Sequence, residues 1–169
     1  ENIETVRAVI GGISGNLLIK EYPTKSVGVS TILAHANLAR TMGYGVDMVV
    51  VDYADILSPG NVGNNANTYV EQGSIYEDLR GLAGELGVPV WTASQASRSS
   101  LDDNIIEAQK VADSYRKIMT ADFVMSLSRK VEDKIGNTGR FHVIKNRFGP
   151  DGMTFPAKVN TNTGKMEIF

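Results

Sequence analysis

The stretch VDMVVVDY, residues 46–53, decides the fold of this 169-residue chain. Its apolar run, 48–51, lacks the polar residue at every second position that marks a strand with one face in water. Continuous apolar runs are typical of parallel sheets whose two faces are covered by helices. We therefore expect a strand over 46–53 that is buried on both sides, with Asp52 at its carboxyl end.

Helical and strand patterns alternate around this strand. Apolar residues three or four apart predict helices, one of which Ser26 can cap, and short apolar runs between turn residues predict strands. The expected order is a helix at 2–10, a strand at 16–22, a helix at 26–42, the strand at 46–53, a helix at 68–86, a strand at 88–95, a helix at 110–120 and a strand at 123–128.

The C-terminal part changes in style. Further strands, separated by short turns rich in Gly, Asp and Asn, are expected at 139–148, 153–159 and 165–169. Such short connections join antiparallel neighbours. We therefore expect one domain over 1–169. It has an α/β core at 1–128, with a three-layer and mostly parallel sheet, and an antiparallel β-meander at 129–169.

Composition excludes several classes of protein. Apolar residues make up 42% and charged residues 21%, which is ordinary for a globular chain and argues against disorder. There is no cysteine, so disulfides and Cys-based zinc sites are impossible. A formal charge of −2 excludes a globally basic nucleic-acid binder, and no apolar run reaches the roughly 18 residues of a membrane span. The chain begins with Glu1 and shows no signal peptide, so we expect a fragment.

Two strand ends carry candidate chemistry. Ligands of open α/β sheets bind at the carboxyl ends of the strands, where Asp52 and the pair Ser94-Gln95 both lie. Asp52 could hold a hydrated Mg²⁺ on a nucleotide, because this ion prefers oxygen ligands. Gln95 could sense a γ-phosphate or orient a water molecule. The alternative is that each is a polar residue that only marks the end of a strand.

A pair of cations stands near the C-terminus. Lys145 and Arg147 are two residues apart on an expected strand, so their side chains face the same side. Two neighbouring cations repel unless an anion lies between them, which indicates a phosphate site. Segment 128–147 holds six basic and two acidic residues, an excess that fits a phosphate or nucleic-acid contact. The alternative is a solvated basic edge that discourages aggregation.

Two familiar kinds of site are missing from the sequence. The chain has no GxxxxGK[ST] phosphate loop, and the glycine-rich run at 11–15 lacks the lysine and precedes a strand instead of a helix. His35 and His142 do not have the spacing of metal ligands. We therefore interpret the glycine-rich run as a turn and both histidines as structural.

Three blocks, taken together, resemble the motor domain of DnaB-type replicative helicases, and the phage-encoded branch of this RecA-like family in particular. The blocks are VVVDY at 49–53, PVWTASQASR at 89–98 and KNRFGP at 145–150. Their order and spacing resemble the family's Walker B strand, its sensor strand ending in Ser-Gln-x-x-Arg, and its K-x-R-x-G-P strand. NLLIKEYPT at 16–24 also resembles the strand that precedes the Walker B unit.

The resemblance implies roles for single residues. Asp52 would be the Walker B carboxylate that acts on Mg²⁺ through water, with Tyr53 as the neighbouring aromatic residue. Gln95 would be the sensor that couples the nucleotide state to the DNA loops. Lys145 and Arg147 would reach the γ-phosphate bound by the next subunit, with Arg147 as the arginine finger.

The resemblance also implies contacts with DNA. The loops around 97–109 and 129–139 would line a central channel that tracks single-stranded DNA by its backbone, with Arg98, Arg129 and Lys130 as basic contacts. The parent would be an ATP- and Mg²⁺-dependent replicative DNA helicase that forms a ring of identical subunits, expected to be a hexamer. Its expected location is the cytoplasm, that of a bacterial host if a phage encodes it, and no membrane contact is expected.

One departure from the family concerns the N-terminal side. There the family has its phosphate loop and the strand bearing the catalytic glutamate, and neither occurs in this sequence. We therefore expect the chain alone to be inactive as an ATPase. Because the family sheet places the missing strands between strands present here, we expect the chain to re-pair its strands, dimerise or recruit an upstream segment. The alternatives are a degenerate RecA-like module for DNA binding or oligomerisation, and a RecA-like ATPase of recombination or signalling.

Overall fold

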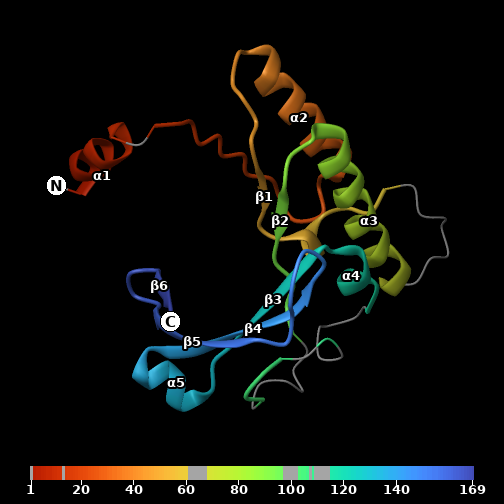
Figure 1. Ribbon diagram of the computed structural model, residues 1–169. Helices are drawn as coiled ribbons and strands as arrows, with labels where there is room; N and C mark the ends of the chain where they lie inside the picture. Colours follow the sequence, from red (N-terminus) through yellow and green to blue (C-terminus); the bar gives the residue numbers. More distant parts are fainter. Residues whose placement is uncertain (1, 13, 61–67, 97–102, 107, 109–114) are drawn as a thin grey trace.

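The computed structural model describes residues 2–12, 14–60, 68–96, 103–106, 108 and 115–169. Helices and strands alternate in the first part of the chain, and strands dominate the last part (Figure 1). In chain order the elements are α1 (Asn2–Gly11), α2 (Val29–Thr41), β1 (Val49–Val51), the 3-10 helix η1 (Ala54–Ile56), α3 (Thr68–Leu86), β2 (Val90–Thr92), α4 (Tyr115–Thr120), β3 (Phe123–Ser128), α5 (Val131–Gly136), β4 (Thr138–Asn146), β5 (Thr154–Asn160) and β6 (Lys165–Ile168).

The described strands form two sheets. β1 and β2 pair in parallel, with Val50 opposite Trp91. β3, β4, β5 and β6 form an antiparallel sheet in that order. The α/β class, with a parallel sheet and C-terminal antiparallel strands, is therefore confirmed.

The larger core lies between β1–β2 and the helices α2 and α3, which pack side by side (Figure 1). Ile75, Leu79 and Leu82 of α3 are buried, and their spacing of three and four residues places them on one face of the helix. They pack in one cluster with Val51 of β1. α3 spans the residues that its periodicity predicts, 68–86. A smaller core lies within the antiparallel sheet.

The opposite face of the parallel pair is open to solvent. Met48 and Val50 are 54% and 69% exposed, and Trp91 is 48% exposed. The expectation that 48–51 is buried on both faces is therefore wrong, because the core cluster covers only the face that carries Val51. Successive side chains of a strand point to opposite faces, so a cover on one side leaves every second apolar residue in water.

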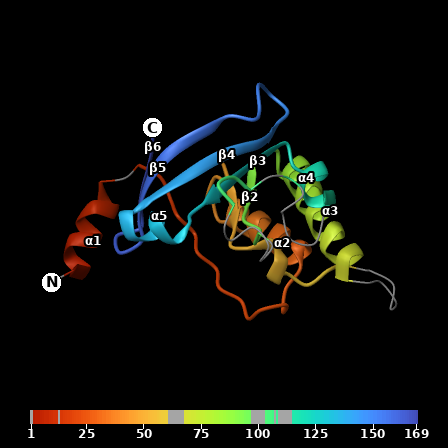
Figure 2. The ribbon, with the colours of Figure 1, turned by 90° about the horizontal axis from the view of Figure 1, so that it is seen from below.

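The N-terminal segment also departs from expectation. α1 forms close to the residues predicted for it, and in both views it lies apart from α2, α3 and α4 (Figures 1 and 2). Residues 16–22, expected as a strand, belong to no helix or strand, and Leu17 and Ile19 are 83% and 79% exposed. An apolar run favours a strand, but a strand needs a neighbouring edge to pair with, and none of the described strands pairs with this segment.

The start of α2 and the lengths of two strands differ in detail from the prediction. α2 begins at Val29, with Gly28 as its N-cap residue, because the Ser26 hydroxyl donates to the carbonyl of Pro23 at 2.6 Å instead of capping the helix. α4 is described from Tyr115 onward, and the residues at 110–114 lie outside the described part of the chain. β1 and β2 are each shorter than the strands expected at 46–53 and 88–95.

The segment 129–139, expected as a loop, contains the short helix α5. Asp133 sits at the third helical position and accepts the Lys130 N–H at 2.8 Å, an arrangement that satisfies a free donor at the start of the helix. Asn137 ends the helix in a left-handed conformation, with φ of 53°. These capping contacts therefore allow a short helix to form in a segment whose polar composition predicts a loop.

In the part of the chain that is described, no helix is both long enough and apolar enough to cross a membrane.

Candidate functional site

The carboxyl edge of β1 and β2 brings three of the predicted site residues together. Asp52 follows β1 and is exposed, and its side chain forms no ion pair or hydrogen bond with any described residue. Tyr53 is the N-cap residue of η1, joined to Asp52 by a cis peptide bond. The Tyr53 hydroxyl accepts a hydrogen bond from Nε2 of Gln95 at 3.1 Å. Parallel pairing of β1 and β2 explains this proximity, because it places both strand ends at one edge.

Thr92 fixes the two strand ends relative to each other. Its hydroxyl donates to the carbonyl of Val51, the last residue of β1, at 2.9 Å. The same oxygen accepts the N–H of Ala54, the first residue of η1, at 2.9 Å. The chain around Asp52 is therefore held to β2 by a side chain as well as by the ladder.

A buried polar cluster lies directly behind this edge. Nζ of Lys117, from α4, lies 2.7 Å from Oδ1 of Asp55, and these two side chains are only 4% and 14% exposed. Asp55 also accepts the hydroxyls of Tyr76 at 2.9 Å and of Ser94 at 3.0 Å. The Lys117 ammonium further donates to Ser94 Oγ at 3.2 Å and lies 5.3 Å from the centre of the Tyr76 ring.

Burial is the main influence on the Tyr76 hydroxyl. It raises the pKa of Tyr76 well above its ordinary value of about 10; the hydrogen bond with Ser94 opposes this shift and the neighbouring carboxylate of Asp55 adds to it. A neutral Tyr76 hydroxyl is therefore retained as a donor to Asp55 in the folded chain.

Neither Asp55 nor Lys117 is among the site residues predicted from the sequence. They are 62 residues apart, so no local motif joins them. The available signal was that each charge borders apolar residues, Asp55 in ADIL at 54–57 and Lys117 in KIM at 117–119. Charged residues are rarely buried unless paired, so two such charges of opposite sign form a candidate pair.

The structure places Lys145 and Arg147 at the end of β4 and just after it, against the last residues of α4 and the segment that follows it. Nζ of Lys145 donates to the carbonyls of Ile118 and Met119 at 2.9 Å each. Nη1 of Arg147 lies 2.8 Å from Oδ1 of Asp122. Both cations therefore contact the stretch 118–122, as their spacing predicts.

A carboxylate of the chain itself occupies the place between the cations where a phosphate is predicted. Asp122 binds Nη1 of Arg147 at 2.8 Å and Nη1 of Arg80 at 3.0 Å. Burial, followed by the positive charge of Arg147, lowers the pKa of Lys145, while Asp122 acts in the opposite direction. The cations are thus held by internal acceptors in this structure.

The predicted DNA contacts lie around α5. Arg129 donates from Nε to the carbonyl of Thr138 at 2.9 Å, and Lys130 precedes the helix as its N-cap residue. Asp133 accepts from Lys130 and Arg140, and the backbone hydrogen bond from Lys130 is the main reason that the pKa of Asp133 is lowered. Arg98, the remaining predicted contact, lies outside the described residues.

Both histidines have protein partners. The His35 ring stacks on the Tyr22 ring, with centroids 5.7 Å apart, and bonds the Tyr22 hydroxyl. His142 Nδ1 lies 2.9 Å from Oγ1 of Thr154. Within the described ranges, no group of three His, Asp or Glu side chains could hold a metal ion.

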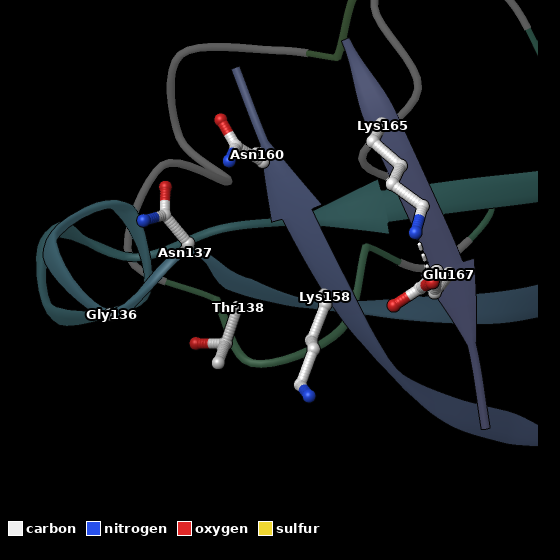
Figure 3. Close-up of a pocket in the computed structure, with 7 residues that line it drawn as sticks. All are labelled: Gly136, Asn137, Thr138, Lys158, Asn160, Lys165 and Glu167. Atoms are coloured by element: carbon white, nitrogen blue, oxygen red, sulfur yellow. Dashed lines mark ion pairs between the residues drawn. The ribbon is translucent and has the colours of Figure 1, made fainter. Parts of the chain in front are cut away.

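A pocket of about 250 Å³ lies at another place in the fold, where the end of α5 meets β4, β5 and β6 (Figure 3). Its lining includes Asn137, Lys158 and an ion pair between Lys165 and Glu167 at 2.7 Å. None of the predicted site residues lines it. The end of α5 supplies backbone carbonyls rather than the N–H groups that bind anions, so this pocket is a poor candidate for a phosphate site.

The parallel strands, the polar carboxyl edge and the antiparallel extension define a RecA-like ATPase fold. The family model for the DnaB-like helicase C terminal domain matches residues 2–164, and the chain belongs to this family. A DnaB-like replicative helicase of Enterobacteria phage T4 is 28% identical over 137 residues, which cover 80% of this chain and 29% of that protein. The replicative DNA helicase DnaB of Rhodothermus marinus is 34% identical over 76 residues, covering 45% of this chain and 8% of that protein.

Solved structures agree on the fold. One structure of an ATPase domain superposes with a TM-score of 0.79 at 24% identity, covering 98% of this chain and 60% of that chain. A DnaB-like replicative helicase studied for its interactions with primase gives a TM-score of 0.78 at 24% identity, covering 98% of this chain and 41% of that chain. The chain therefore spans less than two thirds of each of these relatives.

Proposed function

We propose that this chain, acting over 1–169 as one partial motor domain, supplies the carboxylate and sensor edge and the trans-acting cations of an ATP-driven DNA helicase. The observation that carries the proposal is the edge where exposed Asp52 lies beside the hydrogen-bonded pair Tyr53 and Gln95. The family match supports it, because a helicase motor needs such an edge to respond to nucleotide.

Asp52 fits one ligand position around Mg²⁺ on a nucleotide. Its carboxylate supplies the oxygen atoms that this ion prefers, and no described cation competes for them. Since the described residues include no group of three metal-binding side chains, nucleotide phosphates and water would fill the other positions, as is common for Mg²⁺. Bound Mg²⁺ would neutralise phosphate charge. Asp52 would orient the water molecules around it, and Gln95 would change its hydrogen bond with Tyr53 as the γ-phosphate is lost.

Arg147 and Lys145 would act on the nucleotide of a neighbouring subunit. Arg147 is 47% exposed at its side chain and is held by Asp122, so it could exchange this carboxylate for a phosphate. An arginine that stabilises the charge of the transition state is worth roughly 10³–10⁵ in rate. Arg129 and Lys130, beside α5, would contact the backbone of single-stranded DNA in a ring of identical subunits, which we propose to be a hexamer.

ATP hydrolysis tests the proposal. We expect no turnover by the 169-residue chain, with or without single-stranded DNA, and DNA-stimulated turnover by the polypeptide of the complete reading frame. In that longer protein, Arg147→Ala should lower the rate by roughly 10³–10⁵. Lys158→Ala, which changes an exposed lysine on β5, is the matched control. Robust turnover by the 169-residue chain would refute the assigned half-site, and no turnover by the longer protein would favour a binding module over a motor.

Filter binding tests the DNA contacts. Neutralising phosphates releases counterions, so affinity for single-stranded DNA should fall with salt, with a log–log slope of about 0.7 for each phosphate contact. Arg129→Ala should reduce the slope by about that amount, whereas Lys20→Ala, on the exposed N-terminal segment, should leave it unchanged. A flat response to salt would rule out the channel contacts.

A further inference from the structure

The short helix α4 lies between the two groups of candidate site residues. On one side, the Lys117 ammonium binds Asp55 at 2.7 Å and Ser94 at 3.2 Å, behind the carboxyl edge of β1 and β2. On the other side, the carbonyls of the next two residues, Ile118 and Met119, accept the Lys145 ammonium at 2.9 Å each. Three consecutive residues of one helix therefore contact both groups.

The contacts of Lys117 continue to the sensor. Asp55 accepts the Ser94 hydroxyl on Oδ2 at 3.0 Å, and the N–H of Gln95 lies 3.5 Å from the same oxygen. Lys117 thus holds the carboxylate that holds the backbone just before and at Gln95. Because Lys117 is only 4% exposed, water offers no substitute for these bonds.

The residues that follow α4 also contact Arg147. Asp122 follows α4 by two residues, accepts the N–H of Arg147 at 2.8 Å on its carbonyl and binds the Arg147 side chain at 2.8 Å. The position of the end of α4 therefore sets the positions of both cations.

The two sheets have no strand pairing with each other among the described residues. β2 and β3 do touch through an edge-to-face contact between Trp91 and Phe123, whose ring centroids lie 6.1 Å apart. A ring contact constrains orientation less than a ladder of hydrogen bonds does. The directed contacts of α4 are thus well placed to set the relation between the two sheets.

We propose that α4 is a relay that couples the cations Lys145 and Arg147 to the sensor Gln95, with Lys117 as the positioning residue. The roles of Gln95 as a sensor and of Lys145 and Arg147 as phosphate-binding cations rest on the proposed function. A change at the cation end, such as binding of Arg147 to a phosphate in place of Asp122, would move the end of α4 and change the hydrogen bond of Gln95 with Tyr53.

Nuclear magnetic resonance of the ¹⁵N-labelled 169-residue chain tests the relay without nucleotide or DNA, so its outcome is independent of the ATPase assay. The probe is the side-chain amide of Gln95, identified by its absence in Gln95→Leu. We expect Lys117→Met and Lys145→Met to shift this signal. Lys134→Met, which changes an exposed lysine on the similarly short helix α5, should leave it in place.

Each result decides the matter. A shift in Lys145→Met, whose side chain contacts α4 but not Gln95, together with a silent Lys134→Met, would support the relay. If Lys117→Met shifts the Gln95 signal and Lys145→Met does not, Lys117 acts only locally and the relay is overturned. If Lys134→Met shifts the signal as much as Lys145→Met, the effect is nonspecific and the relay is equally overturned. Should Lys117→Met fail to fold, Lys145→Met with its control still decides.

Discussion

The buried pair of Asp55 and Lys117 should respond very differently to single and double substitution. At the observed 2.7 Å, an effective dielectric constant of about 20 gives an attraction of about 6 kcal/mol. Desolvation of each ion costs several kcal/mol, so the intact pair contributes little net stability. Removing one partner leaves the other charge buried and uncompensated. We therefore expect Lys117→Met, or Asp55→Asn, to cost about 3–5 kcal/mol of unfolding free energy.

The double variant Asp55→Asn/Lys117→Met tests this reasoning. Asn at 55 keeps an oxygen to accept the hydroxyls of Tyr76 and Ser94, and Met at 117 fills the space of the lysine stem. With both charges gone, the cost should be only about 1–2 kcal/mol, less than that of either single change. Urea unfolding followed by the fluorescence of Trp91, the only tryptophan, measures all three values.

An exposed ion pair of the neighbouring residue on α4 provides the control. Arg116 of α4 and Glu77 of α3 lie 3.0 Å apart, with side chains 46% and 53% exposed. Glu77→Gln should therefore change stability by no more than about 1 kcal/mol. If Lys117→Met costs no more than Glu77→Gln, or if the double variant costs the sum of the single ones, the pair is not buried in the way described.

Three further predictions concern stability. Because the folded state lowers the pKa of Asp133, its carboxylate should stabilise the chain above about pH 4, so that wild type and Asp133→Asn differ in melting temperature at about pH 7 and converge near about pH 2. The raised pKa of Tyr76 should lower stability at high pH instead of at low pH. The unfolded chain loses the Tyr76 proton first, so the unfolding free energy should fall as pH rises above about 10. In urea titrations, Tyr76→Phe should lack the part of this fall that Tyr76 causes. Leu79→Ala, at 4% exposure in the larger core, should cost about 2–5 kcal/mol, against less than about 0.5 for Leu18→Ala at 55% exposure, both measured by urea unfolding.

Elements whose structure depends mainly on their own residues were predicted correctly from the sequence. The helix at 68–86 and the strand at 123–128 match the structure residue for residue, because an apolar stripe and a short apolar run between polar turns each suffice to define them. The proximity of Tyr53 and Gln95 followed from a rule about strand ends rather than from their spacing.

Features that depend on a distant partner were missed. The apolar run at 16–22 has the composition of a strand, but a strand also needs the free edge of a sheet to pair with. The local sequence does not show whether such an edge is available. The ion pair of Asp55 and Lys117 joins α4 to the region after β1, and only the fold brings them within reach. The roles of Lys145 and Arg147 on a phosphate stay predictions, since here they bind carbonyl groups and Asp122.

The open face of the parallel pair has a consequence for handling the protein. Met48, Val50 and Trp91 present side chains that are about half exposed or more, in a chain whose net charge is only −2. Charge repulsion between molecules is therefore weak, while contact between such faces removes apolar surface from water. We expect this face, rather than the polar surface, to set the concentration at which the chain stays dispersed. A hydrophobic dye should report its accessibility directly.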